Sequence, residues 1–294
     1  MQELYIQSFD KHKLCLNIYD DVKHPIGVVQ IIHGMQEHQG RYKDFAEFLN
    51  KNNYIVYTSD LRGHGKTRIS TQPWGYSDND ISKEILKDQE IISELIKKTY
   101  PNLKLTILGH SYGSFITQTY LMNYKNINKI ILTGSTYTKG SIYNFANFLT
   151  KTAIKFFGRD ADAKLVEKLS LKAYAKEFKD GNWLTRDESV WQKYLQDDFC
   201  GNSFKLNFYE SLFTLFKNNY SDLNFVDKNL PILILSGSAD PVSNKAKGAK
   251  ALYDFYKKNN LNVKLKIYEN ARHEILNETN KNEIYNDILN FLNK

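Results

Sequence analysis

The chain has 294 residues, which exceeds a typical single domain and suits one large core that carries an insertion. Hydrophobic residues make up 41% of the sequence and charged residues 25%, so the chain can bury a sizeable core and stay in solution. The formal net charge of +7 would favour anionic partners, but the 40 Lys and Arg residues are interspersed with 33 Asp and Glu and form no dense basic block. The composition therefore argues against a nucleic-acid-binding protein.

Cysteine usage and the N-terminal segment point to an intracellular location. Cys15 and Cys200 lie far apart, show no metal-binding spacing, and are expected to be buried reduced thiols. Residues 1–14 contain charged side chains and no continuous apolar run, so they do not resemble a signal peptide. No run approaches the roughly 20 apolar residues that a membrane-spanning helix needs. The sequence predicts a cytoplasmic protein.

The chain begins with two stretches of alternating hydrophobicity, residues 4–9 and 14–19, which predict a hairpin of half-buried strands. After them, short β-branched apolar runs alternate with longer helical stretches. Such runs are typical of parallel strands buried on both faces by helices. The six predicted strands are residues 28–32, 54–58, 105–108, 130–132, 232–235 and 263–267.

The helical stretches between the strands have recognisable ends. In the clearest case Asp80 is placed to cap a helix over residues 81–99, and Pro101 follows its last residue. The alternation predicts an open, mostly parallel α/β sheet covered by helices, with a functional site at the carboxyl ends of its strands. The other predicted helices are residues 42–51, 115–124, 244–258 and 278–292.

One long segment interrupts this alternation. Residues 137–224 contain helical patterns but no strand run. Within it, apolar side chains at spacings of three and four predict an amphipathic helix. We interpret the segment as a helical cap, or lid, inserted into a core formed by residues 1–136 and 225–294. The spaced side chains are Phe204, Phe208, Leu212, Leu215 and Phe216.

The strongest chemical signal is the G-x-S-x-G sequence at residues 109–113, centred on Ser111. It directly follows a predicted strand and precedes a predicted helix, which is the strand–turn–helix setting that a nucleophile elbow requires. A strained turn of this kind lifts the serine hydroxyl clear of the sheet. We therefore predict that Ser111 is a catalytic nucleophile.

A serine nucleophile needs a base and an acid that orients the base. Asp240 directly follows the predicted strand 232–235, and His273 follows the strand 263–267. Both should emerge at the same edge of the sheet as Ser111, in the chain order Ser, Asp, His. Either residue alone has an ordinary structural explanation, but their joint order predicts a Ser111–His273–Asp240 triad.

The oxyanion of an acyl-transfer reaction must also be stabilised. The turn after strand 28–32 is expected to present the backbone N–H of Met35, and Tyr112 supplies a second N–H directly after the nucleophile. Only backbone atoms are needed, so the side chains at these two positions are free to vary. No H-E-x-x-H sequence or paired cysteine spacing indicates a metal, and no cofactor is expected.

Taken together, these segments resemble the monoacylglycerol lipase and lysophospholipase branch of the α/β hydrolases. The resemblance implies an α/β-hydrolase fold, hydrolysis of carboxylic esters of glycerol without a cofactor, the triad above, and Met35 and Tyr112 as oxyanion donors. The branch usually has a small residue at position 35 and Met at position 112, so the mouth of the site and the substrate size are in question. The resemblance rests on residues 33–38, 41–42, 60–65, 109–113, 240–242 and His273.

Several other polar residues are assigned supporting roles. Asp60, Arg62 and His64 are expected to form a polar network beneath the loops, rather than to act on substrate. Residues 37, 38 and 41 are expected to fix the oxyanion loop. Activity should require neutral His273 and should fall below about pH 6.

Substrate and partners are less constrained by the sequence. A small-molecule ester or lipid is expected, and transient contact of the cap with a membrane surface stays open, as does the oligomeric state. The alternatives are a short-chain carboxylesterase, a thioesterase or an aminopeptidase-like enzyme on the same scaffold, and, in another class, a non-catalytic ligand-binding homologue. Cap side chains that suit an acyl-chain tunnel are Phe145, Phe148, Leu149, Phe156, Phe157 and the stripe at 204–216.

Overall fold

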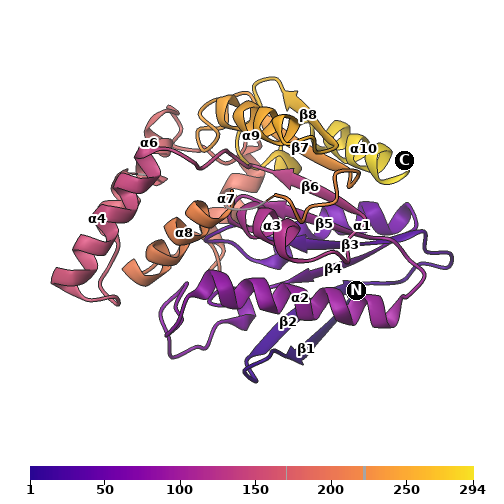
Figure 1. Ribbon diagram of the computed structural model, residues 1–294, viewed down its shortest axis with the longest axis horizontal. Coiled ribbons are helices and arrows are strands. Elements are labelled where there is room, and N and C mark those ends of the chain that lie inside the picture. The colour runs from indigo at the N-terminus through magenta and orange to yellow at the C-terminus, as the bar shows by residue number, and fades with distance from the viewer. Residues whose placement is uncertain (170, 221–222) are drawn as a thin grey trace.

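The computed structural model describes residues 1–169, 171–220 and 223–294, and its centre is an eight-stranded sheet in the order β1-β2-β4-β3-β5-β6-β7-β8 (Figure 1). Strands β1 and β2 form the predicted hairpin, and β2 pairs antiparallel with β4. All later neighbours pair in parallel. The strands are β1 Gln2–Gln7, β2 Lys13–Tyr19, β3 Gly27–Ile32, β4 Tyr54–Ser59, β5 Leu105–His110, β6 Lys129–Thr133, β7 Ile232–Gly237 and β8 Val263–Tyr268.

Helices cover both faces of the sheet, which explains why most parallel strands are buried at every position. Helices α1 (Lys43–Lys51) and α10 (Lys281–Leu292) pack on one face. Helices α2 (Ile81–Thr99), α3 (Tyr112–Asn123) and α9 (Lys247–Lys258) pack on the other. Asp80 caps α2 through the backbone N–H of Lys83. The prediction of an open, mostly parallel sheet covered by helices is confirmed.

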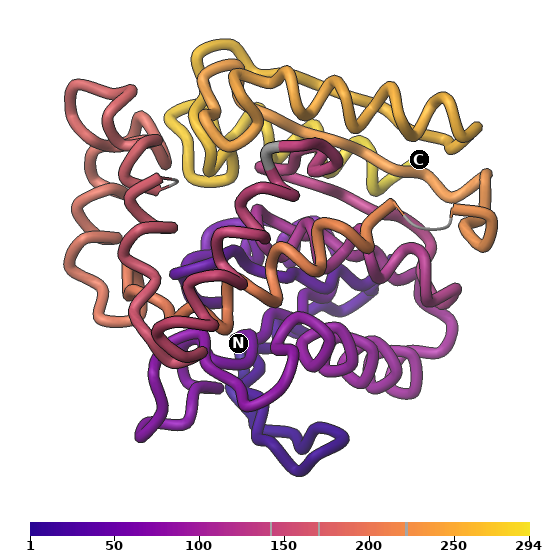
Figure 2. The backbone as a smooth tube through the Cα atoms, turned by 60° about the vertical axis from the view of Figure 1, so that its left-hand side comes forward, coloured from indigo at the N-terminus to yellow at the C-terminus, as the bar shows by residue number. Residues whose placement is uncertain are grey.

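Among the described residues, five helices lie between β6 and β7, where the sequence predicts the insertion. They form a layer beside the carboxyl ends of the strands, and this layer faces the viewer in Figure 2. Ser170, Ser221 and Asp222, which fall in the predicted cap, lie outside the described residues. No helix among the described residues has the length and hydropathy to cross a membrane. The five are α4 Ser141–Phe157, α5 Lys164–Leu169, α6 Leu171–Lys176, α7 Glu188–Gln196 and α8 Leu206–Asn218.

Two predicted helix boundaries differ from the structure for local backbone reasons. The helix predicted over 244–258 begins at Lys247, because Asn244, Lys245 and Ala246 all have positive φ values that an α-helix cannot accommodate. The helix predicted over 115–124 begins at Tyr112, directly after the sharp turn at Ser111. Three short 3₁₀ segments complete the core: η1 Gln39–Tyr42, η2 Gly65–Thr67 and η3 Ile275–Asn277.

The three residues predicted to form a polar network beneath the loops each contact different partners. The Asp60 carboxylate accepts hydrogen bonds from backbone N–H groups in the loops around it. Arg62 pairs with Asp10 and Asp88, whereas His64 packs edge-on against the ring of Phe204. Each residue therefore supports the loops, but the three side chains do not form one network.

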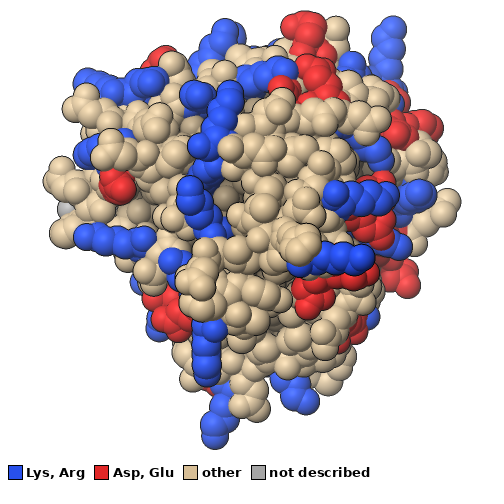
Figure 3. Space-filling model, turned by 90° about the vertical axis from the view of Figure 1, so that its right-hand side faces the viewer, with Lys and Arg blue, Asp and Glu red and all other residues tan. Residues whose placement is uncertain are grey.

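Charged side chains are distributed over the surface as the sequence indicates. On the face shown in Figure 3, Lys and Arg are scattered among neutral and acidic side chains and do not gather into one block. Several of these lysines pair with carboxylates, such as Lys266 with Glu283 and Asp287. Cys15 and Cys200 are free and buried, as predicted.

Candidate active site

Ser111 occupies a sharp turn between β5 and α3. Its backbone has φ 50° and ψ −118°, a conformation that residues other than glycine rarely adopt. The turn fits because its neighbour Gly113 has no side chain: a Cβ there would lie 2.1 Å from the carbonyl oxygen of Ile32 on β3. The chain thus holds a strained serine at the carboxyl edge of the sheet, as an elbow requires.

Asp240 and His273 meet beside this turn. Asp240 follows β7 and is fully buried, and His273 follows β8 and is 2% exposed. His273 Nδ1 lies 3.0 Å from Asp240 Oδ1, which also accepts the Val242 N–H at 2.9 Å. Donation from Nδ1 leaves Nε2 with its lone pair, and Nε2 has no hydrogen-bond partner in the described part of the chain. His273 and Ser111 line the same cavity, so Nε2 is available to act as a base there.

The environment of His273 sets its charge. Burial alone would lower the pKa of the imidazole, but the charge of Asp240 and the hydrogen bond to it outweigh burial, so the pKa lies above its ordinary value. The ring of His110, beside Ser111, packs 4.9 Å from that of His273. Burial and the neighbouring His273 lower the pKa of His110 to about 3, so that the His110 ring is uncharged near neutral pH.

The predicted oxyanion turn lies against the nucleophile. A Cβ on Gly34 would approach the Ser111 Cβ to 3.1 Å, so the turn after β3 and the elbow touch. Met35, Ser111 and Tyr112 line the same cavity. The Tyr112 N–H begins helix α3, where backbone donors have no partner within the helix. The structure therefore brings all five predicted site residues to one edge of the sheet.

A buried ion cluster holds the oxyanion turn. The Glu37 carboxylate accepts the Gly34 N–H at 2.5 Å, the Tyr42 hydroxyl at 2.8 Å and Arg41 Nη1 at 2.9 Å. Arg41 also makes a bidentate contact with Glu274, the residue after His273, at 2.5 and 2.6 Å. Burial would raise the pKa of Glu274, but Arg41 outweighs it and holds this pKa below its ordinary value. The cluster thus connects the oxyanion turn to the histidine loop.

We expect Glu37→Gln to lower kcat/KM about 10- to 100-fold, because the amide cannot accept all three donors and the oxyanion turn relaxes. Loss of the buried charge should also cost about 3 kcal/mol of unfolding free energy. Ester hydrolysis and chemical denaturation measure the two effects. Glu47→Gln, on an exposed carboxylate of α1, is the control and should change neither. A Glu37→Gln protein with native kinetics would show that the turn does not depend on this cluster.

The insertion supplies part of the wall around His273. The Trp183 ring lies 5.1 Å from the His273 ring, and the Trp183 carbonyl accepts the His273 N–H at 3.4 Å. The fully buried Glu278 carboxylate accepts the Arg272 N–H at 2.7 Å and Arg186 Nε at 2.8 Å. The segment after Gly181 is therefore fixed to the histidine loop by several polar contacts.

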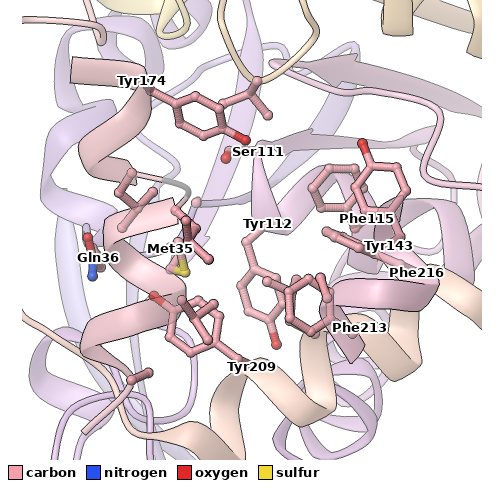
Figure 4. Close-up of a pocket in the computed structure, with 18 of the residues that line it drawn as sticks. Met35, Gln36, Ser111, Tyr112, Phe115, Tyr143, Tyr174, Tyr209, Phe213 and Phe216 are labelled. Atoms are coloured by element: carbon pink, nitrogen blue, oxygen red, sulfur yellow. The ribbon is translucent and has the colours of Figure 1, made fainter. Parts of the chain in front are cut away.

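An apolar cavity of about 480 Å³ lies between the insertion and the elbow. Its walls come from the oxyanion turn, the start of α3, and helices α4, α5, α6 and α8. Of the five cap side chains on α4 expected to form an acyl tunnel, Phe145, Leu149 and Phe157 line this cavity, whereas Phe148 and Phe156 do not. Of the stripe at 204–216, Leu212 and Phe216 line it, whereas Phe204, Phe208 and Leu215 do not. Figure 4 shows aromatic side chains grouped around Ser111, among them Phe115, Tyr143 and Phe216.

One group of described residues has ligand atoms close enough for a metal ion: His38, Asp197 and Cys200, within 4.8 Å of one another. Hydrogen bonding accounts for the geometry of the first two. His38 Nδ1 accepts the Gly40 N–H at 3.3 Å, so Nε2 carries the proton and donates it to Asp197 at 2.8 Å. Burial raises the pKa of the Cys200 thiol, which disfavours the thiolate that a metal needs. We assign no metal to this group.

The sequence reasoning missed the aromatic and acidic residues that surround Ser111, Asp240 and His273. Trp183 and Tyr174 belong to the insertion, where no regular pattern places a side chain relative to the core. The position of Glu274 directly after His273 could have indicated a role near the site. Its partner Arg41, however, lies 233 residues away in the sequence.

Comparisons with known proteins agree with this arrangement. The family model described as serine aminopeptidase, S33, matches residues 23–280. A monoglyceride lipase homolog of Monkeypox virus is 25% identical over 279 residues, covering 93% of this chain and 91% of that protein. A monoacylglycerol lipase of Mycolicibacterium smegmatis is 25% identical over 272 residues, covering 91% and 88%. A thermostable carboxyl esterase from Bacillus coagulans, solved in complex with glycerol, superposes with a TM-score of 0.88 at 24% identity, covering 99% and 97%.

The family match extends over the strands from β3 to β8 and over the helices between β6 and β7. The structural likeness covers nearly the whole length of both chains, which agrees with the open parallel sheet and its flanking helices. The chain belongs to the serine aminopeptidase S33 family of α/β-hydrolases.

Proposed function

We propose that this protein is a serine hydrolase that cleaves carboxylic esters of the monoacylglycerol or lysophospholipid type through an acyl-enzyme on Ser111. The observation that carries the proposal is the buried Asp240–His273 pair, whose free Nε2 opens into the same apolar cavity as the strained Ser111. Two relatives that match about nine-tenths of the chain are named monoglyceride or monoacylglycerol lipases. We also propose that residues 137–224 act as a cap over a core of residues 1–136 and 225–294.

The mechanism follows from the positions of these groups. His273 Nε2 takes the hydroxyl proton as Ser111 Oγ attacks the ester carbonyl carbon. The carbonyl oxygen becomes an oxyanion, which the backbone N–H groups of Met35 and Tyr112 stabilise. The carbon–oxygen bond to the alcohol then breaks, and the departing oxygen takes the proton from His273. Water repeats the sequence on the acyl-enzyme and releases the acid.

The cavity favours an apolar acyl group. Its volume of about 480 Å³ and its lining by aromatic and aliphatic side chains suit a hydrocarbon chain better than a peptide, despite the aminopeptidase name of the family. Helix α4 also exposes Phe145, Phe148, Phe156 and Phe157, each at least 60% accessible. These side chains support the expectation that the cap makes transient contact with a membrane surface, where such esters reside.

The test is the initial hydrolysis rate against acyl length, from acetyl esters to long-chain monoacylglycerols, with the Ser111→Ala protein as the blank. We expect kcat/KM to rise with chain length, because each methylene buried in the cavity contributes about 0.8 kcal/mol. Labelling by a serine-directed phosphonate should require Ser111. Activity confined to acetyl and butyryl esters would instead indicate a short-chain carboxylesterase. If no ester is cleaved above the blank, thioesters, amides or a binding role replace the proposal.

A further inference from the structure

Tyr174 is a polar group in the cavity that the triad and the oxyanion turn do not account for. It lies on helix α6 of the insertion and lines the same cavity as Ser111 and His273. In Figure 4 its side chain crosses the cavity and directs its hydroxyl toward Ser111. The side chains of Met35 and Tyr112 lie on the other side of Ser111 in this view.

Within the described part of the chain, the hydroxyl of Tyr174 has no hydrogen-bond partner and can bind a ligand. Other tyrosines around the cavity are already engaged: the Tyr194 hydroxyl donates to the Gln36 carbonyl at 3.3 Å, and that of Tyr209 lies 3.4 Å from Glu167. Burial and the nearby charge of Asp240 raise the pKa of Tyr174, and no hydrogen bond contributes to this shift. The group is therefore a neutral donor near neutral pH.

Aromatic contacts place Tyr174 on the histidine side of the nucleophile. Its ring lies 5.4 Å from that of Trp183, which in turn packs 5.1 Å from the His273 ring. The alcohol of an ester leaves toward the histidine that protonates it, whereas the oxyanion points to the backbone donors. Tyr174 thus lies on the side where the alcohol departs.

We propose that the Tyr174 hydroxyl binds the alcohol portion of the substrate and donates a hydrogen bond to the leaving oxygen during acylation. This inference rests on the proposed ester hydrolysis. As the carbon–oxygen bond breaks, its electron pair passes to the leaving oxygen, which takes the proton from His273 Nε2. Tyr174 keeps its own proton and stabilises the negative charge that develops on that oxygen before transfer is complete. Tyr174 is then a catalytic residue that the insertion contributes to the core.

The test compares two esters that share one acyl group but differ in the alcohol: a monoacylglycerol and a 4-nitrophenyl ester. Nitrophenolate leaves readily without protonation, so its departure needs little help from a donor. We expect Tyr174→Phe to lower kcat/KM for the glycerol ester roughly 10- to 100-fold, mainly through kcat. The 4-nitrophenyl ester should lose less than about threefold. The melting temperature should stay unchanged, because the hydroxyl has no hydrogen-bond partner to lose among the described residues.

The matched control is Tyr143→Phe. Tyr143 lines the same cavity from helix α4, but its hydroxyl points away from Ser111 in Figure 4. Its loss should affect the two esters equally. An equal loss on both esters in Tyr174→Phe, or native rates on both, would overturn the role of Tyr174 while leaving ester hydrolysis intact. A native protein that cleaves neither ester would instead refute the proposed function itself.

Discussion

Replacement of Ser111 by alanine is expected to reduce kcat on any ester by roughly 10³-fold or more and to abolish phosphonate labelling. The substitution removes only Oγ, so the elbow and the Asp240–His273 pair, joined at 3.0 Å, stay in place. Water can still reach the ester, and the oxyanion donors still polarise it, which is why a residual rate over the uncatalysed reaction should survive. Steady-state kinetics and labelling of the purified protein measure both losses.

Ser111→Gly separates the chemical role of this residue from its conformation. At φ 50° and ψ −118° a side chain costs about 1–3 kcal/mol, and glycine removes that strain. Glycine also makes the unfolded chain more flexible, which lowers the stability of the fold by about 0.4–1 kcal/mol and offsets part of this gain. We therefore expect the Gly variant to be inactive but about 1 kcal/mol more stable to denaturant than the Ala variant. Equal stabilities would mean that the elbow stores no strain.

The predictable parts of this molecule are those governed by local sequence. Buried parallel strands favour largely apolar runs, so residues 28–32, which include one buried polar residue, Gln30, and residues 232–235 could be read directly from the sequence. Chemistry at the ends of those strands follows from topology, because parallel strands deliver their carboxyl ends to one edge. Ser111, Asp240 and His273 could therefore be brought together without any knowledge of contacts.

The unpredictable parts depend on tertiary contacts between distant segments. The Arg41–Glu274 pair joins residues 233 positions apart, and neither side chain stands in a recognisable motif with the other. Insertion helices α5 and α6 are only six residues long and carry no strong amphipathic pattern, so their orientation over the core could not be inferred. The direction of the Tyr174 side chain, toward Ser111, consequently depends on packing that only the fold determines.

The second large expected effect is the loss of activity when Asp240, which we propose orients His273, is replaced. We expect Asp240→Asn to lower kcat about 10²- to 10⁴-fold, because the amide cannot hold the Nδ1–H tautomer that leaves Nε2 free to act as a base. The measurement is kcat/KM against pH for the native and variant proteins. An Asp240→Asn protein within a few-fold of native activity would remove Asp240 from the mechanism.

The pH dependence of kcat/KM tests the role of Asp240 independently. Hydrolysis needs neutral His273, and its pKa in the fold lies above 6.5, so the acid limb of kcat/KM should have its midpoint above pH 6.5 rather than near 6. Asp240→Asn removes the charge that raises this pKa and leaves burial, which lowers it, so the residual limb should move to lower pH. The charged pair should also stabilise the native fold below pH 6.5, and that stability should disappear as pH rises through the raised pKa. Because the variant lacks the charged pair, its unfolding free energy should lose this pH dependence. If the acid limb of kcat/KM instead stays at the same pH in the variant, Asp240 does not set the charge of His273.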